Sequence, residues 1–366
     1  MSSPTLMNNT PPQVVVGVDT HADTHTACIL NTSDGARLGT KTFRADGPGY
    51  RALLQWAGSH GEVSRMGIEQ TSSYGAALTR AARRAGIYDL VEINQPAVLV
   101  RATKGKTDAI DAETAARHVL AGTATAIAKD TDGIIEAIRL IKTQRALAVK
   151  HRAATITQLR SLLITIDDDL RHQLRDLPTT ALIDTCTRLR PDPTQLATPL
   201  HAGKQVLRQV AKRIQSLTTE IDQAEQQLDA LTLRVVPSLR AEPQIGPIGA
   251  AELVTAFGGP GRIVSHAAFA RITGIAPIPA SSGKTDRHRL HRGGNRQANK
   301  TIHMIVIGRM KTDPKTRTYI DDRTPQSKNP NNKRNKKPAI RSLKRHIIRR
   351  CWRLINNDLN NGVDRL

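Results

Sequence analysis

Residues 14–30 read VVVGVDTHADTHTACIL: a β-branched run, an acid, a short polar turn and a second apolar run. Residues 14–18 and 25–30 are predicted strands, because valine, isoleucine and threonine fit a pleated, half-buried surface. Asp19 follows the first run directly. A carboxylate at the end of an apolar strand is costly to bury unless it is paired or binds a cation. This stretch therefore predicts a sheet that carries an acid at its edge.

The same kind of pattern continues along the chain. Residues 63–68 and 90–94 are predicted strands, and residues 49–58 and 76–85 are predicted helices with a glycine near each end. Strands interspersed with helices predict a mixed α/β sheet with helices on its faces. We assign this domain to residues 14–125.

Three further acids stand in comparable places. Glu69 ends a predicted strand, and Asp108 and Asp111 lie three residues apart on a predicted helix, so that both project from one face. Together with Asp19 they can converge at one edge of the sheet. Such oxygen ligands suit Mg²⁺, with Mn²⁺ as the alternative, and two ions about 4 Å apart can clamp the attacking and leaving oxygens of a phosphodiester.

Each acid taken singly also has a structural interpretation. Asp19 could open a turn, Glu69 could be a solvated strand end, and Asp108 could cap a helix. His21 and His25 flank the first acid and are interpreted as turn and strand residues. Only the four acids together, in an α/β context, favour a nuclease-like site.

The middle of the chain, residues 126–238, is predicted to be a helical coiled-coil region. Apolar residues recur there at spacings of three and four, which is an a/d heptad pattern. The pattern comprises Leu207, Val210, Ile214, Leu217, Ile221, Ala224, Leu228, Leu231 and Val235, and an earlier set comprises Ile156, Leu159, Leu163, Ile166 and Leu170. Proline-rich residues 191–199 must turn the chain between the two sets. Pairing within one chain and pairing between two chains both stay open.

Residues 239–325 are predicted to form a mainly α-helical domain, followed by a basic tail and helix over 326–366. Residues 245–249, IGPIG, precede an apolar helix and resemble a helix-hairpin-helix element. In such an element Gly246 and Gly249 would let backbone N–H groups approach a phosphate. A helix start that needs small residues is the alternative interpretation.

The charge is distributed unevenly. The 366 residues include 54 Lys and Arg against 32 Asp and Glu, a formal charge of +22, and residues 284–366 hold 23 of the basic and 6 of the acidic residues. A surplus of this size indicates a polyanionic partner, either nucleic acid or an anionic membrane surface. Aromatic residues make up only 2% of the chain, so phosphate contacts rather than base stacking are expected to dominate.

The remaining features bound the cellular context. Polar residues 1–13 are predicted to be a disordered tail without the basic and apolar regions of a signal peptide. No apolar run reaches the roughly 18 residues of a membrane span, so we expect a cytoplasmic, nucleoid-associated protein with no membrane partner. Cys28, Cys186 and Cys351 lie far apart, which indicates reduced structural thiols rather than disulfides or a zinc site.

Several of these stretches resemble one known family. They are GVDTHADTHTACIL at 17–30, GIEQTSSYGAAL at 67–78, KGKTDAIDAETAARHVLAG at 104–122, IGPIGAAELVTAFGG at 245–259 and the segment 262–304. Their order and spacing over most of residues 14–320 resemble the IS110 family of bacterial insertion-sequence transposases, relatives of the Piv-type DNA invertases.

The resemblance implies a RuvC-like, RNase H-fold domain whose DEDD tetrad falls on Asp19, Glu69, Asp108 and Asp111. It also implies a second domain with a catalytic serine just before a glycine. In GIAPIPASSG, residues 274–283, this serine is Ser282, with Ser281 as the alternative one residue away. A phosphoserine intermediate would retain the energy of the phosphodiester, so strand exchange would need no ATP.

The family further implies particular partners: donor and target DNA, a structured non-coding RNA that pairs with both, and a homo-oligomer, dimer or tetramer. The basic residues expected to contact phosphates are Lys284, Arg287, Arg289, Arg292, Arg296 and Lys300. The chain departs from the family in having Ala22 where lysine is frequent, and in a tail unusually rich in Asn and Lys.

Three other functions compete with this interpretation. An actin-like or sugar-kinase ATPase shares the sheet topology, but the turn after Asp19 lacks the glycine of a phosphate loop. A non-catalytic DNA-binding protein, such as a decayed transposase, would not need all four acids and the serine. A RuvC-like endonuclease or resolvase that uses water as nucleophile is the enzymatic alternative.

Overall fold

The computed structural model describes residues 12–94, 107–283, 285, 288–289, 291–324 and 335–362. Two compact units make up the chain. The first contains the residues up to 136 together with 257–268, and the second contains residues 137–256 and 269–365.

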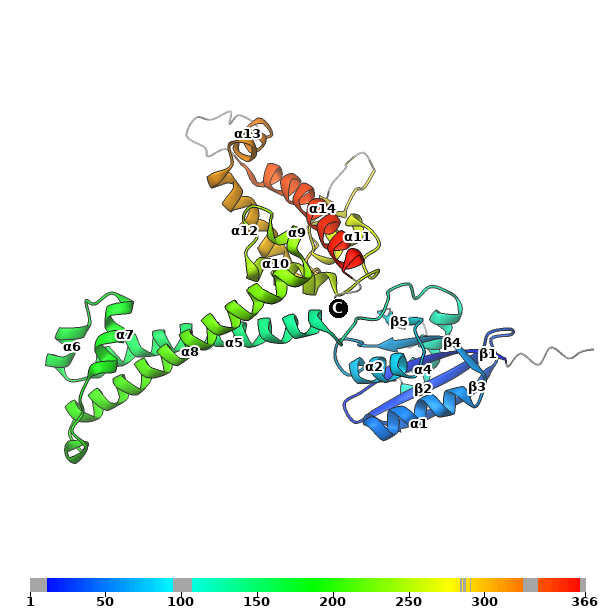
Figure 1. Ribbon diagram of the computed structural model, residues 1–366, viewed down its shortest axis with the longest axis horizontal. Coiled ribbons are helices and arrows are strands. Elements are labelled where there is room, and N and C mark those ends of the chain that lie inside the picture. Colours follow the sequence, from blue (N-terminus) through cyan, green and yellow to red (C-terminus); the bar gives the residue numbers. More distant parts are fainter. Residues whose placement is uncertain are drawn as a thin grey trace, which may run out of the picture. The chain divides into compact units, whose positions relative to one another are not determined.

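The first unit is built on a five-stranded mixed sheet (Figure 1). Its strands are β1 (Gln13–Thr20), β2 (Thr24–Asn31), β3 (Arg37–Arg44), β4 (Glu62–Glu69) and β5 (Leu90–Ile93). The spatial order is β3-β2-β1-β4-β5; β2 is antiparallel to both β1 and β3, and β4 is parallel to both β1 and β5. The four strands predicted from the sequence are confirmed, and β3 is an additional strand that the sequence analysis missed.

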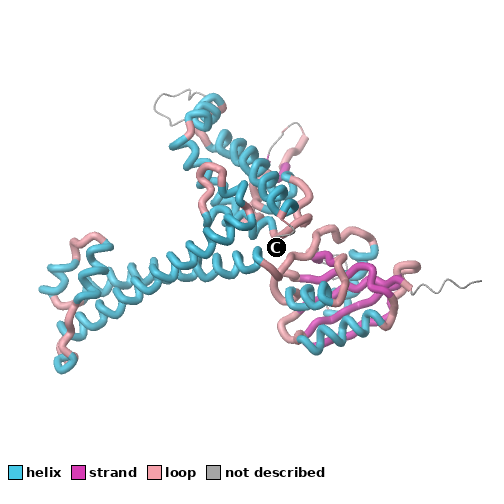
Figure 2. Tube along the Cα trace, viewed as in Figure 1, coloured by secondary structure: helices cyan, strands magenta, loops and turns pink. Residues whose placement is uncertain are grey.

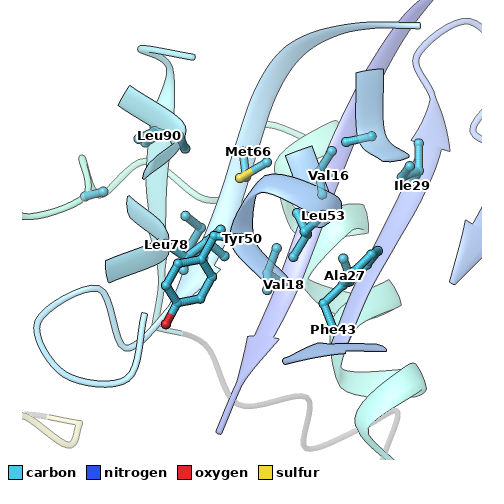
Figure 3. Close-up of a cluster of buried hydrophobic side chains, with 14 of the residues drawn as sticks. Val16, Val18, Ala27, Ile29, Phe43, Tyr50, Leu53, Met66, Leu78 and Leu90 are labelled. Carbon is cyan, nitrogen blue, oxygen red and sulfur yellow. The ribbon is translucent and has the colours of Figure 1, made fainter. Parts of the chain in front are cut away.

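Helices cover both faces of this sheet. They are α1 (Gly47–Gly58) and α2 (Ala76–Arg84) on one face and α4 (Asp108–Leu120) on the other. Alternate residues of β1 divide between two cores. Val16 and Val18 pack with α1 and α2 (Figure 3), whereas Val15 packs with α4. Because both faces of β1 are buried, its sequence is a run of valines rather than an alternation of apolar and polar residues.

Two glycines set the distance between α4 and the sheet. A Cβ at Gly17 on β1 would lie 2.0 Å from the backbone nitrogen of Ala116, and a Cβ at Gly67 on β4 would lie 2.4 Å from Cγ2 of Val119. Since these separations are far shorter than van der Waals contact, only glycine allows α4 to pack so closely. The close packing holds the N-terminal turn of α4 at the carboxyl ends of β1 and β4.

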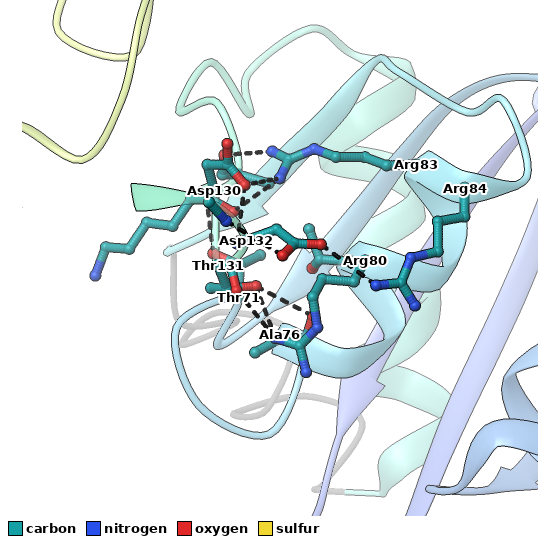
Figure 4. Close-up of polar contacts among 12 residues, drawn as sticks. Thr71, Ala76, Arg80, Arg83, Arg84, Asp130, Thr131 and Asp132 are labelled. Atoms are coloured by element: carbon teal, nitrogen blue, oxygen red, sulfur yellow. Dashed lines mark hydrogen bonds and ion pairs between the residues drawn. The ribbon is translucent and has the colours of Figure 1, made fainter. Parts of the chain in front are cut away.

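The segment that follows α4 is anchored on α2 by arginines (Figure 4). Arg80 donates to Oγ1 of Thr131 at 3.1 Å, and Arg83 pairs with Asp130 at 3.1 Å. Arg83 also donates to the carbonyl of Ala128 at 3.1 Å. These contacts fix the chain on the first unit immediately before the next helix begins.

The second unit begins with an antiparallel helix pair. Its elements are α5 (Ile134–Thr165), α6 (Asp168–Leu174), α7 (Thr179–Arg188), the 3₁₀ turn η1 (Pro193–Gln195) and α8 (Pro199–Val235). Hydrogen bonds join Gln144 to Glu220, Arg145 to Glu225 and Arg152 to Thr218, and apolar side chains of α5, α6, α7 and α8 share one core cluster. The helices therefore pair within the chain. Six of the nine predicted heptad positions on α8 are buried and three are half-buried.

The remainder of the unit is mainly helical, with one short hairpin (Figure 2). Its elements are α9 (Pro237–Arg240), α10 (Pro247–Phe257), α11 (His266–Ile272), β6 (Ile278–Pro279), β7 (His288–Arg289), α12 (Arg296–Thr312), α13 (Pro314–Asp322) and α14 (Lys337–Asn361). The C-terminal helix α14 packs on α9, α12 and α13. Residues 326–334 and 363–366 of the predicted basic tail and helix lie outside the described residues.

The three cysteines are buried and free, as predicted. Cys28 lies in β2, Cys186 in α7 and Cys351 in α14. Burial raises the pKa of Cys186 to about 11 and that of Cys351 to about 12. Their thiolate forms are therefore scarce near neutral pH, which suits a structural role.

Among the described residues, no helix is both long and apolar enough to cross a lipid bilayer.

Candidate active site

Asp19 lies at the carboxyl end of β1 and is only 5% exposed. Burial raises the pKa of this carboxyl, and the acids Asp108 and Asp111 raise it further, while His21 lowers it. Burial and two neighbouring acids both disfavour the charged form of this carboxyl. A cation bound beside Asp19 would supply that charge.

The N-terminal turn of α4 brings two more acids to this point. Thr107 caps the helix by accepting a hydrogen bond from the backbone nitrogen of Ile110 at 3.3 Å. Asp108 and Asp111 follow within the first turn, where the helix dipole favours negative charge. Asp111 is 4% exposed, whereas the side chain of Asp108 is about half exposed.

His21 completes a cluster that the sequence analysis did not include. Its Nε2 lies 3.2 Å from Oδ2 of Asp19 and 3.4 Å from Oδ1 of Asp108. One ligand atom from each of these three residues lies within 4.8 Å of the other two. The sequence predicts His21 to be a turn residue, and its position just after β1 agrees with that prediction. The spacing of acid and imidazole two residues apart was the signal that could have revealed its side chain as part of the cluster.

Glu69 occupies the matching position on the neighbouring strand. Val18 pairs with Ile68 in the parallel ladder, so Asp19 and Glu69 end adjacent strands. The hydroxyl of Thr20 donates to the backbone carbonyl of Glu69 at 3.1 Å, which ties the two strand ends together. Because Ile68 faces α1 and α2, alternation directs Glu69 to the face covered by α4. All four predicted acids therefore belong to elements that end or begin at the same edge of the sheet, but among the described residues only Asp19 and Asp108 of the four, together with His21, have ligand atoms within 4.8 Å of one another.

The donor set fits a hard divalent cation. Carboxylate oxygens are the ligands that Mg²⁺ and Mn²⁺ prefer, and imidazole is an additional ligand for first-row metals. A divalent ion bound among these acids would stabilise the charged form of the buried Asp19 carboxyl.

Ser282 lies in the second unit, at the tip of a hairpin. Strands β6 and β7 pair through Ile278 with Arg289, and beyond them Ser282 exchanges backbone hydrogen bonds with Thr285 at 3.1 and 3.0 Å. Gly283 adopts a left-handed backbone conformation at φ 55°, which the tight turn requires. Both Ser282 and Ser281 are exposed, so either hydroxyl could be reached by a large substrate.

The predicted phosphate-contacting residues fall into two groups. Lys284 and Arg287 lie outside the described residues. The others line three cavities of the second unit: Gly246, Gly249 and Lys300 line one of about 710 Å³, Arg289 lines one of about 540 Å³, and Arg292, Arg296 and Lys300 line one of about 670 Å³. The structure therefore gathers the described members of this set around concave, basic surfaces.

Two family models match the chain. A model for the DEDD domain of IS110 transposases, described as "Transposase", matches residues 16–166. A second model, described as "Transposase IS116/IS110/IS902 family", matches residues 237–321. The first match contains all four acids, and the second contains Ser282.

Two curated relatives are similar over shorter segments. An uncharacterized 43.6 kDa protein of insertion element IS110 from Streptomyces coelicolor is 37% identical over 87 residues, which is 23% of this chain and 21% of that protein. An uncharacterized 42 kDa protein of insertion element IS900 from Mycobacterium paratuberculosis is 26% identical over 156 residues, 42% of this chain and 38% of that protein. The chain thus aligns with well under half the length of either relative.

An RNase H-like α/β sheet with acids at the ends of its central strands defines a transposase domain of the DEDD class, which implies a divalent-metal site. With the second family domain following it in the expected order, the chain belongs to the IS110 family of insertion-sequence transposases.

Proposed function

We propose that this protein cleaves and transfers DNA strands during movement of an insertion sequence, with divalent cations held by Asp19, Glu69, Asp108 and Asp111. One observation carries the proposal: the buried carboxyl of Asp19 lies beside Asp108, Asp111 and the imidazole of His21 at the end of β1. Mg²⁺ is the expected ion and Mn²⁺ the alternative. When bound there, the ion would act as a Lewis acid toward a phosphoryl oxygen and the leaving oxygen.

The chain's own residues have defined tasks in this proposal. The strand ends of β1 and β4 fix Asp19 and Glu69, and the close packing of α4 fixes Asp111. Fixed ligands reduce the reorganisation needed when charge develops on the reacting phosphate. His21 would either join the ligands or hold Asp19 and Asp108 apart at ligand spacing.

Ser282 is the proposed nucleophile, with Ser281 as the alternative. Its oxygen would bond to phosphorus while the bond from phosphorus to one deoxyribose oxygen breaks, and the hydroxyl proton would end on that released oxygen. One phosphoester replaces another, so a deoxyribose hydroxyl of a second strand can displace the serine without ATP. Exposure of Ser282 at a hairpin tip supports this role, since DNA must reach it.

A structured non-coding RNA and a homo-oligomer, dimer or tetramer, complete the proposal. The residues proposed to contact phosphates would do so through basic side chains or backbone groups, and in this chain 2% of the residues are aromatic. A protein of this composition holds backbones better than it reads bases, and pairing to a guide RNA would supply the sequence specificity. A protein that only binds DNA, or a resolvase that uses water, would need no such RNA.

The acid site can be tested by Asp19→Asn. Metal-dependent cleavage of DNA carrying the element's ends should fall by at least about 100-fold, the order expected on removing one stabilising group from a transition state. Asp89→Asn is the matched control, because Asp89 is a partly exposed acid of the same unit that pairs with Arg65 at 2.7 Å. Equal activity of Asp19→Asn and wild type would refute the metal assignment.

The serine can be tested by trapping protein joined covalently to labelled DNA. We expect the adduct to form in wild type and Ser281→Ala and to be absent in Ser282→Ala. An adduct that persists in Ser282→Ala and disappears in Ser281→Ala would move the nucleophile by one residue. Cleavage without any adduct would favour hydrolysis by water.

The RNA can be tested by purifying the protein from cells that carry its flanking non-coding DNA and sequencing the nucleic acid retained at moderate salt. One discrete RNA that maps beside the gene would support guided recombination. A heterogeneous mixture that salt removes would indicate phosphate binding alone.

A further inference from the structure

The C-terminal helix α14 contributes to two neighbouring basic cavities, the first of which is lined in part by the serine hairpin. One, of about 540 Å³, is lined by residues of β7, α12, α14 and the loop before β6. The other, of about 670 Å³, lies at the N-terminal end of α12 and against α14. Gly274, Asn299 and Lys344 line both cavities, so the two share one wall.

Lysine, arginine and histidine side chains are prominent in both cavities. In addition to Lys344, the first is lined by His288, Arg289, Arg341 and Arg345, and the second by His291, Arg292, Arg296, Lys300 and His303. No carboxylate of the described residues lines either one. Cavities of this composition attract anions, and the second gains from the N-terminal dipole of α12.

The wall that the cavities share is built rigidly. A Cβ at Gly294 would lie 2.4 Å from the backbone nitrogen of Gly274, so the two loops cross in direct contact. The side chain of Asn299 donates to the carbonyl of Thr273 at 2.9 Å and accepts a hydrogen bond from Lys344. Loops held together in this way present a preformed surface to a ligand.

Lys344 is the distinctive member of the set. It is half-buried, and burial lowers the pKa of its ammonium group. An ammonium group has three protons to donate, and the amide oxygen of Asn299 accepts one. No carboxylate of the described residues forms an ion pair with it. A partly desolvated cation between two basic cavities is stabilised when a phosphate arrives.

We propose that Lys344 and Arg341 of α14 bind phosphates of a nucleic-acid backbone that crosses from one cavity to the other beside the serine hairpin. The ligand is a phosphodiester chain, RNA or DNA, rather than a single small anion, because two cavities share Lys344. Lys300 lines the second cavity and also the cavity of about 710 Å³ beside α10, which extends the basic surface along α12. Helix α14 lies beyond the residues that either family model matches.

The test is the salt dependence of binding, measured by fluorescence anisotropy with a DNA duplex and with an RNA hairpin of equal phosphate number. The slope of log K against log salt is negative, and each lost phosphate contact reduces its magnitude by about 0.9 for duplex DNA. Lys344→Met and Arg341→Met should each reduce the magnitude of the slope by about one and weaken binding about five- to tenfold at 0.1 M salt. Arg353→Met is the matched control, since Arg353 is exposed on the same helix and lines neither cavity.

The outcomes separate clearly. A smaller salt-dependence slope with just one of the two probes would identify that nucleic acid as the ligand. A smaller slope with both probes would identify the phosphodiester backbone that they share. Slopes that change equally in Arg341→Met and Arg353→Met would refute the proposal, because only net charge would then matter. Lys344→Met should keep the melting temperature of the Asp19→Asn protein in which it is made, and a large fall in that temperature with an unchanged slope would show a structural role instead. All variants carry Asp19→Asn, so failure of the proposed cleavage chemistry would leave this result intact.

Discussion

The acidic sheet edge of the first unit and the basic cavities of the second are assembled by different means. The acids stand at the ends of regular elements, where strand register and the Gly17 contact with α4 fix them. The basic cavities are lined by loops and helix surfaces brought together by a crossing at Gly274 and Gly294. Strands and a helix therefore position the residues of the proposed metal site, whereas loops and helix surfaces position the residues proposed to bind nucleic acid. A strand cannot shift without changing its register, whereas a loop can, so the first region should tolerate changes less well.

The largest effect is expected from Gly17→Ala. Its methyl group would meet the backbone nitrogen of Ala116 at 2.0 Å, and neither β1 nor α4 can move away without disturbing the core. The free energy of unfolding of the first unit should fall by about 3 kcal/mol, the upper end for overpacked cores. Urea unfolding followed by Trp56 in α1 measures this, and Trp352 in α14 reports the second unit separately.

Gly58→Ala serves as the control, since nothing lies within 4 Å of a Cβ at that position. It should change stability by no more than about 0.5 kcal/mol. If Gly17→Ala behaved like this control, the close packing of α4 would not be what positions the acids.

A smaller effect is expected from the equivalent change in the second region, Gly294→Ala. Its methyl group would lie 2.4 Å from the nitrogen of Gly274, but neither residue lies in a strand or a helix, so a displacement there breaks no strand register. We expect a loss of about 1 kcal/mol in the Trp352 transition, near the centre of measured single substitutions. Nucleic-acid affinity should fall as well, because Gly274 lines both basic cavities.

Gly293→Ala is the neighbouring control, where the nearest atom to a Cβ is Nε2 of His291 at 3.5 Å, an ordinary contact. The affinity of the Gly293→Ala variant for nucleic acid should match that of wild type. A loss of affinity as large as in Gly294→Ala would mean that the loop crossing has no special part in forming the cavities.

The smallest effect is a pH dependence of stability, measured in EDTA. Burial raises the pKa of Asp19, so its carboxyl holds a proton more tightly in the folded than in the unfolded protein. Its contribution to stability is therefore fully present below about pH 4 and is lost as pH rises through the folded pKa. Asp19→Asn should have a higher melting temperature than wild type at pH 7, and the difference should vanish near pH 3.

Asp192→Asn should behave in the opposite way. Hydrogen bonds from Thr194 lower the pKa of Asp192, so its carboxylate contributes stability that is lost as pH falls. The variant should melt at a lower temperature than wild type at pH 7. Equal pH profiles for both variants would show that burial does not govern Asp19.

Regular elements with apolar cores were predictable from the sequence. The valine run of β1, the heptad positions of α8 and the acids on α4 all lie where their patterns placed them. Strand β3 was missed because only Phe43 of its eight residues is buried, so this edge strand has no apolar alternation.

Contacts between distant residues were not predictable in the same way. His21 and Asp108 are far apart in the sequence, so no local sequence pattern predicts that their side chains lie close together. The cavity wall joins Gly274, Asn299 and Lys344 from three separate segments. The hairpin strands that present Ser282 are two residues each, too short for any periodicity.

The three buried cysteines can report local unfolding of the protein. Cys28, Cys186 and Cys351 are each inaccessible in a different part of the molecule: the sheet, the helix pair and the C-terminal helix. An alkylating reagent can reach each thiol only when its own surroundings open. Mass spectrometry of alkylated peptides would thus time three separate opening events in the unmodified chain, and would show which of them a bound nucleic acid slows.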